Sequence, residues 1–107
     1  MDHLLTRILP RLVLDTVQCL LVAHDYVDEG LRSETRDAIK CLRKADMTDI
    51  EKAASVLRGV APHLHNVEAS LHDANRSLTA RKIGDVRRRV LTMTAPVVNC
   101  QSSLAAD

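Results

Sequence analysis

The chain has 107 residues, 46% of them apolar, and its 15 basic and 14 acidic residues leave a formal charge of +1. This length fits a single domain, residues 1–107, and the longest apolar runs are too short to cross a membrane. Tyr26 is the only aromatic residue, so the core must consist of aliphatic side chains and Met. Such side chains pack well between closely spaced helices, which favours helix pairing, including across a dimer.

The cysteines and histidines give no sign of a disulfide framework, a metal site or a catalytic centre. The three cysteines, Cys19, Cys41 and Cys100, are an odd number without paired spacing, and no zinc-ligand spacing is present. There is no glycine-rich phosphate loop and no nucleophile elbow. The start of the chain does not follow the pattern of a signal peptide. We therefore expect a cytoplasmic protein with reduced thiols that has no cofactor, no small-molecule substrate and no enzymatic activity.

Apolar residues at helical spacing predict a first helix over about residues 3–26. Pro10 lies in this stretch and either kinks the helix or marks its start, with residues 1–9 as a separate turn. The polar segment Asp25–Gly30 ends in glycine and predicts a helix stop and a turn.

The second helix is predicted over about residues 31–60, a length of roughly 45 Å at the standard rise. Its apolar register slips near Asp46 and Thr48, and Thr48–Glu51 spells a capping box that would start a new helix. The helix is either continuous with a shifted register or broken near residues 46–48. We expect continuity, because Lys44 and Ala45 are good helix formers and no Gly or Pro intervenes.

Gly59 and Pro62 are expected to interrupt or kink the chain after this helix. The spacing of Leu64, Val67, Leu71, Ala74 and Leu78 predicts a third helix over 62–80. A fourth is predicted over 83–105, with Gly84-Asp85 as its cap and Pro96 as a kink or end. The predicted fold is all-α, an antiparallel helical hairpin or bundle of three to four helices, assembled as a homodimeric four-helix-type bundle. Its core is expected to contain Leu12, Val17, Leu20, Leu42, Leu57, Leu64 and Leu71.

The second predicted helix carries a basic stripe on one face. Arg32, Arg36, Lys40 and Arg43 are three or four residues apart, so they share a side of the helix. On the opposite side lie Leu31, Ala38, Leu42 and Ala45. Lys44 flanks the stripe, and Arg58 would extend it further along a continuous helix. Such a row can contact successive phosphates, whereas the ordinary interpretation is a solvated face with local ion pairs.

A second basic cluster lies later in the chain, at Arg81-Lys82 and Arg87-Arg88-Arg89. Three consecutive arginines span most of a helix circumference, so they cannot all face one ligand. They could bind phosphate or serve nuclear import, or they could simply keep the surface soluble.

If the partner is a nucleic acid, the composition indicates a duplex. Proteins that bind single strands stack bases on aromatic rings, and Tyr26 is the only such ring. No short recognition helix in a defined major-groove motif is present. Double-stranded RNA, in contrast, is read mainly through phosphates and 2′-hydroxyls, without base stacking.

Residues 9–62 resemble the small silencing-suppressor protein of insect nodaviruses. The segment Cys41–Thr48 is similar to the family's Cys-Leu-x-Lys-Ala-x-Leu-Thr run, with methionine in place of the second leucine, and Leu9-Pro10, Tyr26 and Pro62 also correspond. That family binds double-stranded RNA as a helical homodimer and hides it from the host's RNA-interference machinery.

The resemblance implies that Cys41 and Lys44 lie at an RNA-facing surface and that Arg36 matches a basic position of the family. The residues alone place Cys41 beside Leu42 on the packing side, so the two predictions disagree. A further RNA-contacting arginine of the family falls on Glu51 here, which departs from the pattern.

The predicted function is sequence-independent binding of double-stranded RNA by a viral suppressor of RNA silencing. The alternative is a non-enzymatic protein-interaction bundle, such as an adaptor or a secretion-type component, whose apolar faces meet a partner helix. The residues predicted to bind RNA are Arg32, Arg36, Lys40, Cys41, Arg43, Lys44 and Arg58.

Overall fold

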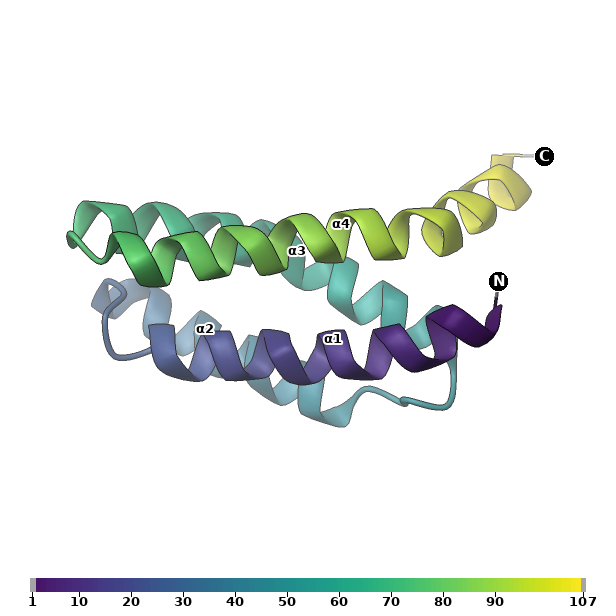
Figure 1. Cartoon of the computed structure of the whole chain (residues 1–107), viewed down its shortest axis with the longest axis horizontal. Coiled ribbons are helices and arrows are strands. Elements are labelled where there is room, and N and C mark those ends of the chain that lie inside the picture. Colours follow the sequence, from purple (N-terminus) through teal and green to yellow (C-terminus); the bar gives the residue numbers. More distant parts are fainter. Residues whose placement is uncertain (1, 107) are drawn as a thin grey trace.

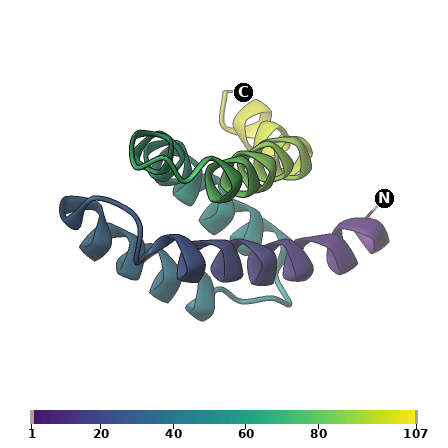
Figure 2. The same ribbon diagram turned by 60° about the vertical axis from the view of Figure 1, so that its left-hand side comes forward.

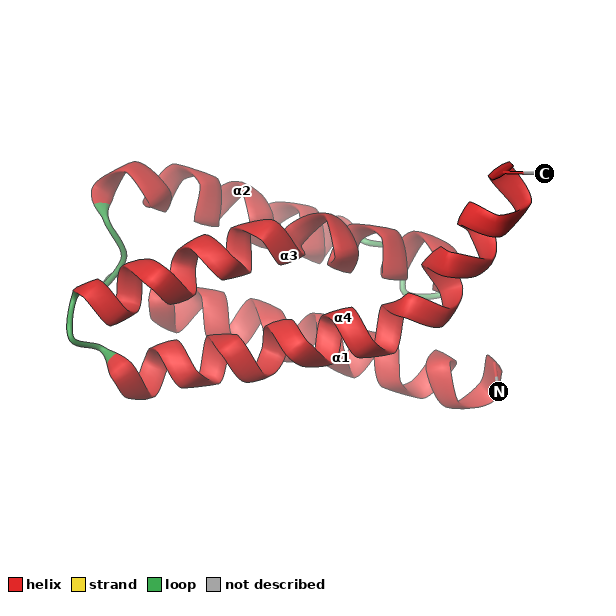
Figure 3. Cartoon of the chain, turned by 90° about the horizontal axis from the view of Figure 1, so that it is seen from above, coloured by secondary structure: helices red, strands yellow, loops and turns green. Residues whose placement is uncertain are grey.

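The structure is a computed structural model that describes the backbone of residues 2–106 and the side chains of residues 4–97. Four helices follow one another along the chain: α1 (Asp2–Ala23), α2 (Glu29–Lys44), α3 (Ile50–Asp73) and α4 (Ser77–Ala106). No strand occurs in the described part (Figure 3). The all-α helical bundle predicted from the sequence is confirmed.

The helices run up and down along one long axis. In Figure 1, α1 and α4 lie in front and α2 and α3 behind, and the α1–α2 and α3–α4 turns are at the end opposite the two termini. The view in Figure 2 shows α1 and α2 side by side. α2 contacts α1 and α3, but among the described residues it makes no contact with α4. α2 therefore has an outer side that no other helix covers.

The second predicted helix is broken, so the prediction of a continuous helix over 31–60 is wrong. Asp46 accepts hydrogen bonds from the backbone N–H of Thr48 (2.9 Å) and from its hydroxyl (2.6 Å), and these bonds lower the pKa of the Asp46 carboxyl. Asp49 then accepts from the backbone N–H of Lys52 at 3.2 Å and so caps α3. Short acidic side chains offer the backbone these alternatives to a helix, and here they outweigh helix propensity.

The third and fourth helices meet earlier than predicted. Gly59 and Pro62 lie inside α3 and do not interrupt it. The chain turns after Asp73, where Asn75 adopts a left-handed conformation (φ 62°). The backbone N–H groups of Asn75 and Arg76 donate to the carbonyls of His72 (3.0 Å) and Leu71 (2.8 Å), which is a Schellman C-cap.

This shift also corrects two residue placements. Leu78, expected among the apolar positions of the third helix, lies in the first turn of α4 with 75% of its surface exposed. Gly84, expected to cap the fourth helix, lies inside α4, where a β-carbon would collide with the Glu68 carboxylate. Pro10 lies within α1, so residues before it do not form a separate turn.

The buried core confirms the seven expected core residues, all of which are 7% exposed or less. Alanines such as Ala54 and Ala61 lie between the leucines and let the helices approach closely. The buried hydroxyls of Thr16 and Thr94 donate to carbonyls one turn earlier, at 2.7 and 2.6 Å, so these polar groups are satisfied. Within the described residues, no helix is both long and apolar enough to cross a bilayer.

Candidate nucleic-acid interface

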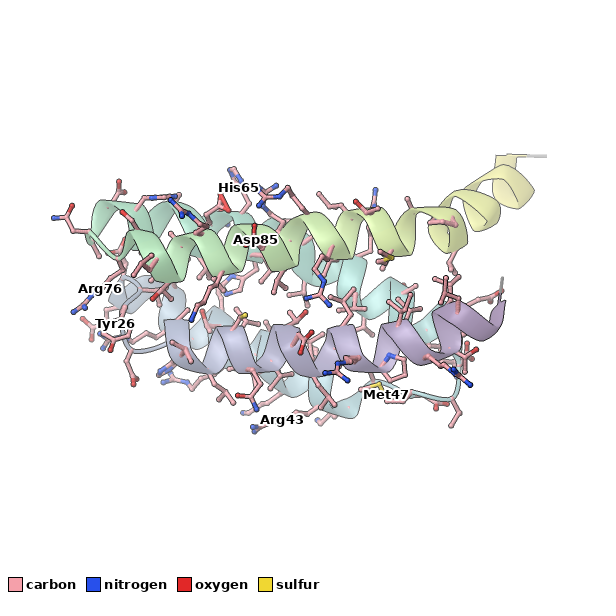
Figure 4. All side chains as sticks on the ribbon, in the orientation of Figure 1. Tyr26, Arg43, Met47, His65, Arg76 and Asp85 are labelled. Atoms are coloured by element: carbon pink, nitrogen blue, oxygen red, sulfur yellow. The ribbon has the colours of Figure 1, made fainter. Side chains whose placement is uncertain are left out.

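The basic residues of α2 lie beside its buried face. Thr35, Ala38, Ile39 and Leu42 point into the bundle. The exposed cations lie next to this apolar side, and Figure 4 shows Arg43 pointing away from the bundle. An open groove of about 420 Å³ runs between α1 and α2, and the residues that line it are Leu21, His24, Asp25, Arg36, Ile39, Lys40 and Arg43.

The cations of α2 have no acidic partners among residues 4–97, whose side chains the structure describes. Among the described side chains, no carboxylate lies within 4.0 Å of Arg32, Arg36, Lys40, Arg43 or Lys44. Arg32 is half-buried, and its Nε is buried without a hydrogen-bond partner; the other four are exposed. The five basic and three acidic residues of α2 give this helix a net charge of +2. We call the surface formed by these five side chains the α2 basic face.

The last turn of α2 contains two of these cations. Arg43 and Lys44 lie in the last turn of the helix, where the negative end of the helix dipole favours positive charge. The helix dipole therefore stabilises these two side chains in a place where they remain open to solvent.

The structure exposes Cys41 and places Arg58 apart from the α2 basic face. Cys41 is exposed, so its expected place on the packing side is wrong. Arg58 belongs to α3, where its guanidinium donates to the carbonyl of Leu91 on α4 at 3.1 Å. Together with His65 and Arg87, it lines a groove between α3 and α4. The prediction that Arg58 extends the stripe is therefore wrong, because the break after Lys44 changes the direction of the chain.

The three consecutive arginines of the second basic cluster are arranged differently, while its Arg81 and Lys82 are exposed and form no ion pair among the described side chains. Arg87 pairs with Glu68 of α3 at 3.5 Å, and Arg89 pairs with Asp15 of α1 at 3.1 Å. Arg88 pairs with Asp85, one turn earlier on α4. We call these three arginines the α4 arginine cluster. Each cation has its own carboxylate, and two of the three pairs join α4 to another helix.

α2 is held to α3 by a half-buried histidine, His63, that the sequence did not identify. The hydroxyl of Thr35 donates to the carbonyl of Leu31 at 2.7 Å, so it accepts from Nε2–H of His63 at 2.8 Å. Nδ1 of His63 faces the Glu34 carboxylate at 3.7 Å. Burial lowers the pKa of His63, while Glu34 raises it to a smaller extent. His63 and Thr35 lie on different helices, and no sequence pattern links them.

Tyr26, the single aromatic residue, is engaged within the protein. The guanidinium of Arg76 lies over its ring, 4.3 Å from the centroid, and Figure 4 shows the two side chains together at one end of the bundle. One face of the ring is therefore covered.

Within the described residues, no group of three or more His, Cys, Asp or Glu side chains converges as a metal site would require. In the comparisons with known proteins, no family model, curated protein or solved structure matches the chain.

Proposed function

We propose that this protein binds double-stranded RNA through the α2 basic face without reading its base sequence. The observation that supports this proposal is the pairing of charges. Four of the five cations of α2 are exposed, and none of the five has an acidic partner among the described side chains, whereas each arginine of the α4 cluster has one. Unpaired cations at helical spacing can neutralise phosphates and release the counterions that surround a nucleic acid.

The limited aromatic surface supports a duplex as the ligand. Single-strand binding depends on bases stacking on aromatic rings, and Arg76 already covers one face of Tyr26. Recognition of duplex RNA needs cations and hydrogen-bond donors along the backbone and 2′-hydroxyls. The α2 basic face offers such groups on a rigid helix.

The length of the α2 basic face supports the binding of one duplex by two copies of the protein together. From Arg32 to Lys44 it is about 18 Å long, whereas double-stranded RNA-binding domains span roughly 16 base pairs. A homodimer would present two such faces to one duplex. Since one chain supplies all four helices of the bundle, the proposed dimer joins two bundles.

The resemblance of residues 9–62 to nodaviral suppressors supports a biological role for this binding. The protein would cover viral duplex RNA in the host cytoplasm and keep it from the nuclease that starts RNA silencing. No covalent chemistry is required, because occlusion alone blocks the nuclease.

A gel-shift assay with a duplex of about 25 base pairs tests the proposal. The double variant Arg36→Glu with Lys40→Glu should lose duplex binding by at least about 100-fold, because two phosphate contacts become repulsions. The matched control is Arg81→Glu with Lys82→Glu on α4, which changes the net charge by the same amount and should keep binding within a few-fold.

Equal losses in the two variants would show that bulk charge drives binding and would contradict the assignment to α2. The wild-type protein should bind duplexes of different sequence alike. It should also protect them from a double-strand-specific ribonuclease, while the α2 variant should not. No shift of any duplex at micromolar protein and low salt would overturn the proposal.

A further inference from the structure

The outer side of α1 carries large apolar residues that no helix of the same chain covers. Leu4, Leu14 and Leu21 are 64%, 62% and 41% exposed, although the other side of α1 is buried. These leucines belong to a row spaced alternately three and four residues apart, the spacing with which one helix packs along another. We call this row the α1 outer stripe; it consists of Leu4, Arg7, Arg11, Leu14, Gln18, Leu21 and Asp25.

Charge along the stripe changes sign from one end to the other. Arg7 and Arg11 lie near its start, and no carboxylate of the described side chains pairs with them. Asp25 lies at its end, with its side chain 81% exposed and its one ion pair made with the adjacent His24 at 3.1 Å. Asp25 remains close to the helical path, since the N–H of Val27 still donates to the carbonyl of Ala23 at 3.1 Å.

We propose that the α1 outer stripe pairs with the same stripe of a second copy, with the two helices antiparallel and Arg7 opposite Asp25 of the second copy. In this register Leu14 lies opposite Gln18, and Leu21 packs on the aliphatic part of Arg11. Each charged contact occurs twice, because the pair is symmetric.

Charge complementarity selects this arrangement over its alternatives. A parallel pair would place Arg7 against Arg7 and Asp25 against Asp25. An antiparallel pair can also be shifted by one heptad in either direction. One shift places Arg7 opposite Gln18 of the second copy, and the other places Leu14 opposite Asp25 of the second copy. Among these arrangements, only the proposed register places Arg7 and Asp25 opposite each other at both ends while Leu14 and Leu21 lie between the charged ends.

The symmetry of such a dimer determines where its two α2 basic faces lie. What this means for RNA binding rests on the proposed function. The two-fold axis is perpendicular to the plane of the two α1 helices, so both α2 helices lie on the same side of that plane. Leu21 and Asp25 of the stripe also line the groove that Arg36 and Lys40 border. The two α2 basic faces would therefore flank the α1 pair on one side of the dimer.

The stripe is about 33 Å long and one helix wide, which places the interface at the small end of specific contacts. We therefore expect a weak dimer that populates at tens of micromolar protein. Its affinity should respond strongly to charge at the two ends.

Sedimentation equilibrium of the full chain without RNA tests the orientation and the register. Arg7→Asp and Asp25→Arg should each weaken the dimer by about tenfold, since each places like charges together at both ends. The double variant Arg7→Asp with Asp25→Arg should recover an affinity within about threefold of the wild type. Arg81→Asp and Asp37→Arg, which make the same charge changes on α4 and α2, should have little effect.

A wild-type protein that stays monomeric at these concentrations, or single variants that dimerise normally, would overturn the proposal. A double variant that does not recover would overturn the register. Each variant is also tested for duplex binding in the gel shift. A further variant, Leu14→Gln, should weaken the dimer and therefore bind one duplex more weakly. Its remaining duplex binding should still depend on Arg36 and Lys40. Normal duplex binding by a monomeric wild-type protein would refute the dimer and leave the proposed function intact.

Discussion

The α2 basic face and the α4 arginine cluster both concentrate cations in a short helical segment, but the fold uses them differently. In the α4 cluster, Arg87 and Arg89 reach Glu68 and Asp15 on neighbouring helices. On α2, the acidic Glu34 faces His63 of α3, and the cations are left on the other side. The density of positive charge in a sequence therefore does not mark a ligand site. A row of several cations along one helix face, none with an internal partner, is the more specific sign.

The difference follows from the place of each helix in the bundle. α4 lies against both α1 and α3, so cations on its flanks meet carboxylates of those helices. α2 contacts the same two helices but approaches them closely at far fewer positions than α4 does, so much of its circumference faces solvent. We accordingly expect the α4 cluster to contribute to stability and the α2 basic face to contribute to binding.

The largest difference between the two regions is expected in the free energy of unfolding when Glu68, the partner of Arg87, is replaced by alanine. Its carboxylate and the Arg87 guanidinium are 21% and 25% exposed, so Glu68→Ala leaves a mostly buried cation without a partner. We expect the free energy of unfolding to fall by about 1–2 kcal/mol, which corresponds to a drop of about 5–10 °C in Tm. Duplex binding should stay within a few-fold of the wild type.

The matched control for this change is Asp37→Ala. It removes one negative charge from the exposed surface of α2, where no ion pair of Asp37 is found among the described side chains. Its free energy of unfolding should change by less than about 0.5 kcal/mol. If thermal unfolding followed by circular dichroism gave similar losses for both variants, the structural role of the α4 cluster would be refuted.

The sequence predicted the helical class and the main core because both depend on the spacing of apolar residues. Leu12, Leu57 and Leu71 recur at helical intervals and are fully buried. Spacing did not locate the helix ends, which depend on single side chains. Asp46 and Asp49 break the second predicted helix through hydrogen bonds to the backbone. The register slip and the capping box had marked this place, but helix propensity favoured a continuous helix.

The candidate site was only partly predictable for the same reason. The row from Arg32 to Arg43 follows from periodicity, but the position of Arg58 depended on where the helix ended. The partners of Arg87 and Arg89 come from other helices, as does the contact between His63 and Thr35. Such long-range pairs leave no pattern in a single sequence, so the difference between paired and unpaired cations became visible only in the fold.

A second, pH-dependent effect concerns the anchoring of α2. Burial lowers the pKa of His63 below that of the unfolded chain, so the unfolded state binds this proton more readily. The stability that neutral His63 provides is then complete above the unfolded pKa of about 6.5 and is lost as the pH falls through the lower folded value.

We therefore expect the Tm of the wild type to fall between pH 7 and pH 5 by more than that of His63→Gln, whose amide can still donate to Thr35. His65→Gln, two residues away in the exposed α3–α4 groove, should follow the wild type. Parallel pH profiles for the wild type and His63→Gln would show that His63 does not couple the attachment of α2 to protonation.

The smallest effect on duplex binding is expected when a single cation is neutralised. Neutralising one cation in each region compares the α2 basic face with the α4 arginine cluster directly. Each phosphate that a cation neutralises contributes about one counterion to the salt dependence of binding. Lys40→Gln should therefore lower the slope of log affinity against log salt by about one and weaken binding equally for all duplex sequences. Arg88→Gln removes a cation already paired with Asp85, so its slope should match the wild type. Equal changes in slope for the two variants would mean that pairing within the protein does not decide which cations meet the duplex.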